Sequence, residues 1–189
     1  MSALRLALII GSNREGRFGP TVADWFAEQA RQFDRLEVDV IDLAAIPLPT
    51  ALDFAAAPDP HVAELGSRLD AADAYVVVTP EYNHSFPAPL KNAIDLYRAE
   101  WRAKPVGFVS YGGMGGGLRA VEQLRLVFAE LHATTVRDSV SFHNAWDRFD
   151  DSGRPVDEAC NGAAKGMLHQ LTWWARALRN AKTAEPYDV

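Results

Sequence analysis

The segment 74-AYVVVTP-80 decides the fold, because six residues from Ala74 to Thr79 form an apolar, β-branched run that stops at Pro80. A strand of this kind needs both faces covered, which is typical of a parallel sheet between two layers of helices. Runs of similar character are Arg5–Ile10, Leu36–Leu43, Val106–Tyr111 and Thr134–Phe142, the second and last alternating rather than continuous. The sequence therefore predicts five strands.

Apolar residues at helical spacing fill the gaps between these strands. The four stripes are Val22, Trp25, Phe26, Ala30 and Phe33 after Pro20; Leu90, Ala93, Ile94, Tyr97 and Trp101 after Pro89; Leu118, Val121, Leu124, Phe128 and Leu131; and Leu168, Leu171, Trp174, Ala175 and Leu178. A shorter helix is expected over His61–Ala72. Strands that alternate with helices predict right-handed βαβ units and a doubly wound α/β fold. With no repeat or linker in view, we expect one domain over residues 1–189.

Composition excludes several classes of protein. Among 189 residues, 25 are acidic and 19 basic, so the net charge of −6 argues against a nucleic-acid partner, which needs a clustered basic face. Apolar runs are too short for a membrane span or a signal peptide, and we therefore expect a cytoplasmic protein. Cys160 is the single cysteine, so neither an intramolecular disulfide nor a cysteine-rich metal site is expected.

The first unusual loop, 11-GSNREGRFG-19, follows the first strand and leads into a helix. Its glycines let backbone N–H groups turn inward, and the helix N-terminus adds partial positive charge. Ser12 adds a hydroxyl group, and Arg14 and Arg17 add charged donors that match phosphate oxygens. The loop lacks both the GxxxxGK[ST] and the GxGxxG pattern. It therefore predicts a site for a terminal phosphate monoester.

The second loop, 80-PEYNHSFP-87, follows the most apolar strand. Its prolines stiffen a mixture of polar and aromatic groups, which indicates an edge for a planar ring because fixed backbone groups bind at low entropy cost. Glu81 can be interpreted as a general base and His84 as a substrate contact or a solvated side chain. Glu81 has no second acid or nucleophile at a telling spacing.

The third loop, 111-YGGMGGG-117, has five glycines in six positions. That many glycines cost backbone entropy, which indicates a tight turn or a close ligand. Gly115, Gly117 and Ala120 also spell GxGxxA, with Asp138 about 20 residues further on, as in a dinucleotide fingerprint. We do not favour that interpretation, because Gly115 lies several residues beyond the strand and Asp138 falls inside the fifth strand.

The stretches GSNREGR, PEYNHSFPAPLKNAID and SYGGMGG together resemble the NAD(P)H-dependent FMN reductase family, which includes quinone, azo-dye and chromate reductases. The resemblance runs from about Leu4 to about Phe142. It implies a flavodoxin-like parallel sheet in the order 2-1-3-4-5, non-covalently bound FMN, and homodimers or homotetramers. It also implies that NAD(P)H passes hydride to the flavin N5 and then gives way to an acceptor such as a flavin or quinone.

The resemblance assigns roles to ten residues. Ser12, Arg14 and Arg17 would hold the FMN phosphate, Pro80, Glu81, Tyr82 and Asn83 would line the isoalloxazine ring, and Tyr111, Gly112 and Gly113 would approach its pyrimidine side. No side chain is required as acid, base, nucleophile or metal ligand, so we expect no catalytic residue and no metal. The tail after Val156 is expected to be a covering helix.

Two alternatives come from other classes of protein. One is an electron-carrier flavoprotein, against which the paired arginines argue, since electron-carrier flavodoxins resemble a hydroxyl-rich phosphate loop. The other is a sensory flavin-binding module, with Trp173 and Trp174 as its interaction surface.

Three apolar residues lie off the main helical stripes: Leu96, Leu126 and Val127. Their positions favour burial against a second copy of the chain. The residues leave NADPH, NADH and several acceptors open.

Overall fold

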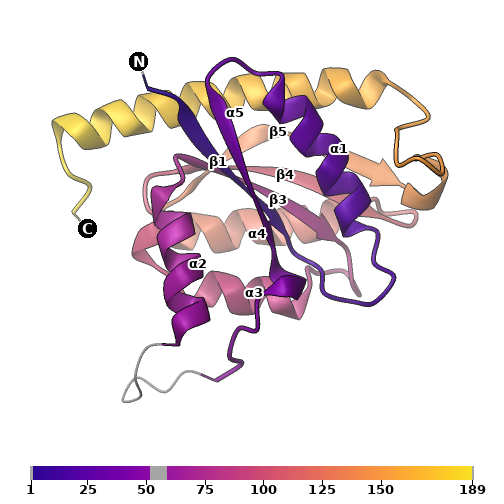
Figure 1. Cartoon of the computed structure of the whole chain (residues 1–189), viewed down its shortest axis with the longest axis horizontal. Helices are drawn as coiled ribbons and strands as arrows, with labels where there is room; N and C mark the ends of the chain where they lie inside the picture. Colours follow the sequence, from indigo (N-terminus) through magenta and orange to yellow (C-terminus); the bar gives the residue numbers. More distant parts are fainter. Residues whose placement is uncertain (1, 52–58, 189) are drawn as a thin grey trace.

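The computed structural model describes residues 2–51 and 59–188 and contains a five-stranded parallel sheet in the order β2-β1-β3-β4-β5 (Figure 1). The predicted flavodoxin-like fold is therefore confirmed. The strands are β1 (Leu4–Ile10), β2 (Leu36–Asp42), β3 (Ala74–Pro80), β4 (Pro105–Gly112) and β5 (Thr134–His143). β3 lies at the centre with all seven residues buried, as its sequence predicts.

Helices cover both faces of the sheet (Figure 1). They are α1 (Gly19–Arg31), α2 (Pro60–Ala71), α3 (Ala88–Asp95), α4 (Leu118–Glu130) and α5 (Ala159–Ala184), with short 3₁₀ helices η1 (Leu43–Ala45), η2 (Ala99–Trp101) and η3 (Ala145–Asp147). α1 and α5 pack on one face, and α2, α3 and α4 pack on the other. The expected covering helix after Val156 is α5, the 26-residue helix that crosses the sheet.

Alternate side chains of β1 enter two separate hydrophobic clusters. Leu8 and Ile10 pack beneath α1 and α5, whereas Ile9 packs beneath α2 and α3. Phe26 and Trp101 are among the largest fully buried side chains of the two clusters. Burying one such side chain stabilises the fold by about 1.5–3 kcal/mol, so each cluster holds its helices firmly on the sheet.

The prediction that one helix continues to Trp101 is wrong. α3 ends at Asp95, and the chain turns before η2. The Tyr97 hydroxyl donates to the Val62 carbonyl at 2.8 Å, and the Trp101 indole N–H donates to the Ile94 carbonyl at 3.1 Å. Both large rings stay buried because the turn brings their polar atoms to these acceptors.

The prediction that Trp174 belongs to a buried stripe is also wrong, since this side chain is 41% exposed. Leu171 and Ala175 lie on the buried line of α5, and Trp174 is rotated by about 100° from Ala175. Trp173 is exposed beside it, with ring centroids 5.1 Å apart. Phe33 lies two residues beyond the end of α1, outside the helix that was expected to carry it, and packs against the core there.

The loops that follow β1, β3 and β4 leave the sheet at the same edge. Gly11 N–H donates to the Val78 carbonyl at 2.9 Å, and Pro80 and Tyr111 are paired in register, so the three strand ends lie side by side. Ligands of open α/β sheets bind at this carboxyl edge. Over the described ranges, no helix has the length and apolar character needed to cross a membrane.

Candidate functional site

Two hydroxyl groups meet at the start of α1, one from the loop that follows β1 and one from the end of β4. Ser12 is fully buried, and its hydroxyl lies 3.1 Å from that of Tyr111, the penultimate residue of β4. A Cβ on Gly19, the first residue of α1, would lie 2.7 Å from Ser12 Oγ and 2.9 Å from Tyr111 Oη. Only a glycine lets the helix start this close to both hydroxyls.

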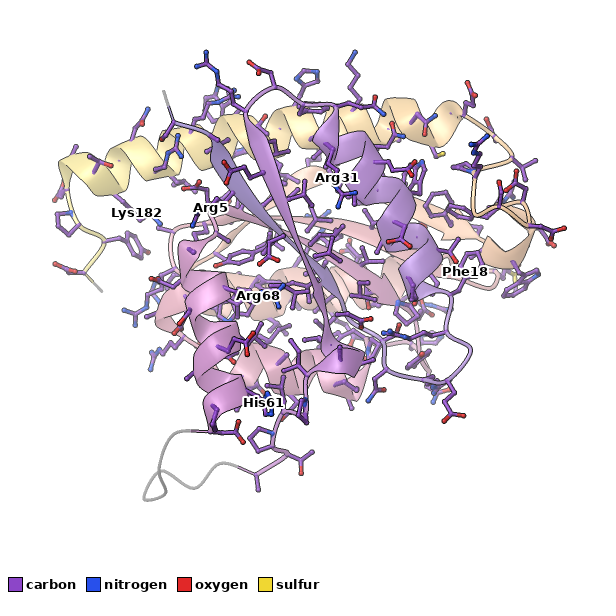
Figure 2. All side chains as sticks on the ribbon, viewed as in Figure 1. Arg5, Phe18, Arg31, His61, Arg68 and Lys182 are labelled. Carbon is purple, nitrogen blue, oxygen red and sulfur yellow. The ribbon has the colours of Figure 1, made fainter. Side chains whose placement is uncertain are left out.

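The N-terminus of α1 is open to an anion from outside the chain. The N-cap residue, Phe18, makes no side-chain hydrogen bond to the helix, and the first turn carries no acidic residue. Figure 2 shows Phe18 beside the start of α1. Backbone N–H groups and the positive end of the helix dipole form an anion site when no side chain caps them.

Arg17 braces this loop against the end of β2. Its guanidinium donates to both carboxylate oxygens of Asp42, with Nη1 at 2.6 Å from Oδ1, and also to the Ser12 carbonyl. The Arg17 hydrogen bond holds the pKa of Asp42 below its usual value, and Asp42 raises the pKa of Arg17. Asp42 went unnoticed in the sequence, although it is the last residue of a strand that ends at the carboxyl edge.

Arg14 connects the first loop to the second. Its side chain lies over the ring of Tyr82, with Cζ 3.5 Å from the ring centroid. Arg14 is exposed, unlike Arg17, and is engaged by no carboxylate within the described ion pairs. A cation over an aromatic face contributes about 0.5–1 kcal/mol at an exposed site. Such a contact uses no hydrogen-bond donor, so the N–H groups of Arg14 remain available to a phosphate.

The second loop is a tight hairpin. Tyr82 N–H donates to the Ser85 carbonyl at 2.8 Å, and Ser85 N–H donates back to the Tyr82 carbonyl at 3.1 Å. Asn83 and His84 have φ of 51° and 68°, as the central residues of a type I′ turn require. Asn tolerates this left-handed backbone, so Asn83 was a signal that could have predicted the hairpin.

The third loop folds tightly over the end of β4. The Gly116 carbonyl accepts hydrogen bonds from Ser110 Oγ at 2.8 Å and from Ser141 Oγ at 2.7 Å. Gly117 has a φ of 83°, and a Cβ there would lie 2.6 Å from the Ser110 Cβ. The glycines are therefore needed for the turn itself, which leaves Gly112 and Gly113 half-exposed beside it.

Tyr111 keeps its proton at neutral pH. Burial raises the pKa of its hydroxyl to about 12, with the Ser12 hydrogen bond opposing the shift. A protonated phenol can donate a hydrogen bond, so one of the two hydroxyl protons joins Tyr111 to Ser12 and the other remains for a ligand oxygen.

All ten residues that the sequence assigns to cofactor binding lie at this one edge: Ser12, Arg14, Arg17, Pro80, Glu81, Tyr82, Asn83, Tyr111, Gly112 and Gly113. Glu81 N–H donates to the Tyr111 carbonyl at 3.3 Å, which ties the second loop to the third. Hydroxyls, an open helix N-terminus and the Arg14 guanidinium fit a phosphate, and the hairpin and glycine loop fit a planar ring. The donor set thus suits FMN. Among the described residues, no group of three or more His, Cys, Asp or Glu could hold a metal ion.

A doubly wound parallel sheet in the order 2-1-3-4-5 defines a flavodoxin-like fold, in which ligands bind at the carboxyl edge. The family model described as NADPH-dependent FMN reductase matches residues 4–147. The chain belongs to this family. It is an FMN-dependent oxidoreductase that uses NAD(P)H as its co-substrate.

Individual relatives agree with this assignment. An NAD(P)H-dependent FMN reductase of Schizosaccharomyces pombe is 37% identical over 120 residues, which span 60% of each chain. An NAD(P)H:quinone oxidoreductase of Solanum tuberosum is 30% identical over 186 residues, or 93% of this chain and 95% of that protein. Among solved structures, the flavoenzyme NAD(P)H:(acceptor) oxidoreductase FerB of Paracoccus denitrificans has a TM-score of 0.75 at 24% identity, covering 93% of this chain and 98% of FerB.

Proposed function

We propose that FMN binds across the three loops of the carboxyl edge and that the bound flavin reduces a small acceptor such as a quinone or a free flavin. The observation that carries this proposal is the approach of Ser12, Tyr111 and Gly19 at an uncapped helix N-terminus. In the proposed arrangement, Ser12 and Arg14 contact the phosphate, and Arg17, whose guanidinium is bound by Asp42 and the Ser12 carbonyl, supports the phosphate loop. Pro80, Glu81, Tyr82 and Asn83 line the ring, and Tyr111, Gly112 and Gly113 approach its pyrimidine side.

FMN, when bound, supplies the hydride chemistry between NAD(P)H and the acceptor. The chain's own residues bind and orient the reactants. Glu81 is engaged by Arg119, and His84 lies within 2.6 Å of the same arginine, so neither is placed as a free acid or base. We therefore propose that no side chain acts in proton transfer. His84→Ala should lower turnover about tenfold or less, whereas a general acid–base residue is typically worth about 10²–10⁴.

The acceptor class is inferred from relatives. The matched potato protein is named an NAD(P)H:quinone oxidoreductase and the fission yeast protein an FMN reductase. The test is to titrate purified apoprotein with FMN and then to mix the loaded protein with NADPH or NADH, followed by a quinone. We expect flavin absorbance to bleach with a nicotinamide and to recover with the quinone. A protein that binds FMN but does not bleach would contradict the proposal and favour an electron carrier.

We also propose a homodimer or homotetramer. Leu126 on α4 is 75% exposed, while Leu96 and Val127 are half-buried, so three apolar side chains on this side of the sheet are not fully covered within the chain. Light scattering behind size exclusion measures the mass directly.

We further propose that residues 1–189 form one FMN-binding domain. We also propose a cytoplasmic location, where NAD(P)H is supplied, and cell fractionation with immunoblotting tests it.

A further inference from the structure

The hairpin of the second loop is fastened to helix α4. Arg119, in the first turn of α4, forms an ion pair with Glu81, and its backbone N–H donates to Glu81 Oε2 at 3.3 Å. Its Nη1 lies 2.6 Å from Nε2 of His84. One turn later, Gln123 Nε2 donates to the His84 carbonyl at 2.6 Å and Gln123 Oε1 accepts from Ser85 Oγ at 2.6 Å. Arg119 and Gln123 therefore hold the hairpin through contacts with three residues: Glu81, His84 and Ser85.

The ion pair is partly enclosed. The Glu81 side chain is 7% exposed and that of Arg119 is 49% exposed. A carboxylate removed from water needs an opposite charge and hydrogen bonds, and Arg119 supplies both. An arginine in the first turn of a helix opposes the helix dipole, which indicates that its position is held by this partner. The ion pair with Arg119 therefore fixes the position of Glu81 at the base of the hairpin.

The third loop makes room for the same pair. A Cβ on Gly115 would lie 2.6 Å from Arg119 Nη2 and 3.3 Å from Glu81 Oε2. The φ of Gly115 is not positive, so its backbone does not require a glycine. A side chain at this position would instead push the guanidinium end of Arg119 away from Glu81.

We propose that Arg119 and Gln123 are positioning residues. They hold the hairpin in the position in which Tyr82 and Asn83 contact the flavin ring. This inference rests on the proposed FMN site. Both act through the hairpin and not on the cofactor, so their loss weakens contacts with the ring and leaves the phosphate loop intact. Preorganised backbone groups bind at low entropy cost, and a hairpin released from α4 loses that advantage.

The test compares two flavins on the apoproteins of Arg119→Met and Gln123→Ala. FMN and riboflavin share the ring, and riboflavin lacks the phosphate. Both dissociation constants should rise about tenfold, the effect of one lost hydrogen bond, so that their ratio stays at the parent value. Glu122→Ala is the matched control, because this exposed neighbour on α4 pairs within its own helix, with Arg125 at 3.7 Å. It should leave both constants unchanged.

A second readout needs no flavin. The amide protons of Tyr82 and Ser85, which close the hairpin, should exchange about tenfold faster in the apoproteins of both variants than in the parent. If Arg119→Met fails to fold, Gln123→Ala decides the question, together with Gly115→Ala, whose added methyl should displace Arg119.

Two results would overturn the inference: parental flavin affinities with parental amide exchange, or a loss confined to FMN, which would place Arg119 at the phosphate. If the parent protein binds neither flavin, the proposed FMN site fails instead. The exchange measurement still decides whether α4 holds the hairpin.

Discussion

Gly19→Ala is the substitution that strains the proposed phosphate site most directly. The new Cβ would lie 2.7 Å from Ser12 Oγ, 2.9 Å from Tyr111 Oη and 2.9 Å from Ile10 Cγ2. None of these atoms is the far end of a flexible, exposed side chain, because all three residues are buried. The loop, the helix start or the end of β4 must therefore shift.

The sign of the stability change follows from two opposing terms. Replacing glycine by alanine in a helix gains about 0.5–1 kcal/mol, whereas overpacking a dense site costs about 1–3 kcal/mol. We expect the free energy of unfolding of the apoprotein to fall by about 1–2 kcal/mol. Displacing the Ser12 hydroxyl removes a hydrogen bond to a charged phosphate, worth about 1.5–3 kcal/mol, so FMN affinity should fall roughly tenfold to a hundredfold.

Denaturant unfolding of the apoprotein and a flavin-fluorescence titration measure the two effects. Gly162→Ala is the matched control, because its added methyl meets no atom within 4 Å on the exposed side of α5. That control should stabilise the protein by up to about 1 kcal/mol and leave FMN binding unchanged. If Gly19→Ala behaves like Gly162→Ala in both assays, the close approach at the start of α1 does not govern FMN binding, and the reasoning is refuted.

Three further predictions address other parts of the molecule. Arg14→Ala should weaken FMN binding roughly tenfold to a hundredfold and riboflavin binding far less; equal losses for both would contradict a phosphate role. The folded-state pKa of Asp42 lies below its unfolded value of 3.8, so the ion pair with Arg17 adds stability above pH 3.8, and this stability is lost as the pH falls through the folded pKa. Asp42→Asn should therefore make the free energy of unfolding depend less on pH in this acid range. Leu126→Glu should shift the oligomer toward a mass near 20.8 kDa in light scattering, and a parent already at that mass refutes the oligomer.

The buried strands and the three loops could be predicted from the sequence because their signals are local. The run Ala74–Thr79 is apolar on both faces, as is typical of a strand buried at the centre of a parallel sheet. The Gly112–Gly117 run marks a tight turn by composition alone. These patterns also place the loops at one edge, since parallel strands end on the same side.

The remaining features depend on contacts between distant segments. Arg17 and Asp42 are 25 residues apart in the sequence, and Glu81 and Arg119 are 38 residues apart. Neither ion pair can be predicted from such a spacing. The helix expected to reach Trp101 stops at Asp95, and beyond its end the Tyr97 hydroxyl donates to the Val62 carbonyl, 35 residues away in the sequence. Tertiary context overrides local propensity at all of these positions.

The central claim is that FMN binds across the three loops at the carboxyl edge. A crystal structure of the FMN-loaded protein tests it most directly. The account predicts phosphate oxygens within about 3 Å of Ser12 Oγ and of backbone N–H groups at the start of α1, with the ring against Tyr82 and Asn83. A flavin bound elsewhere, or a phosphate remote from Ser12 and Arg14, would contradict it.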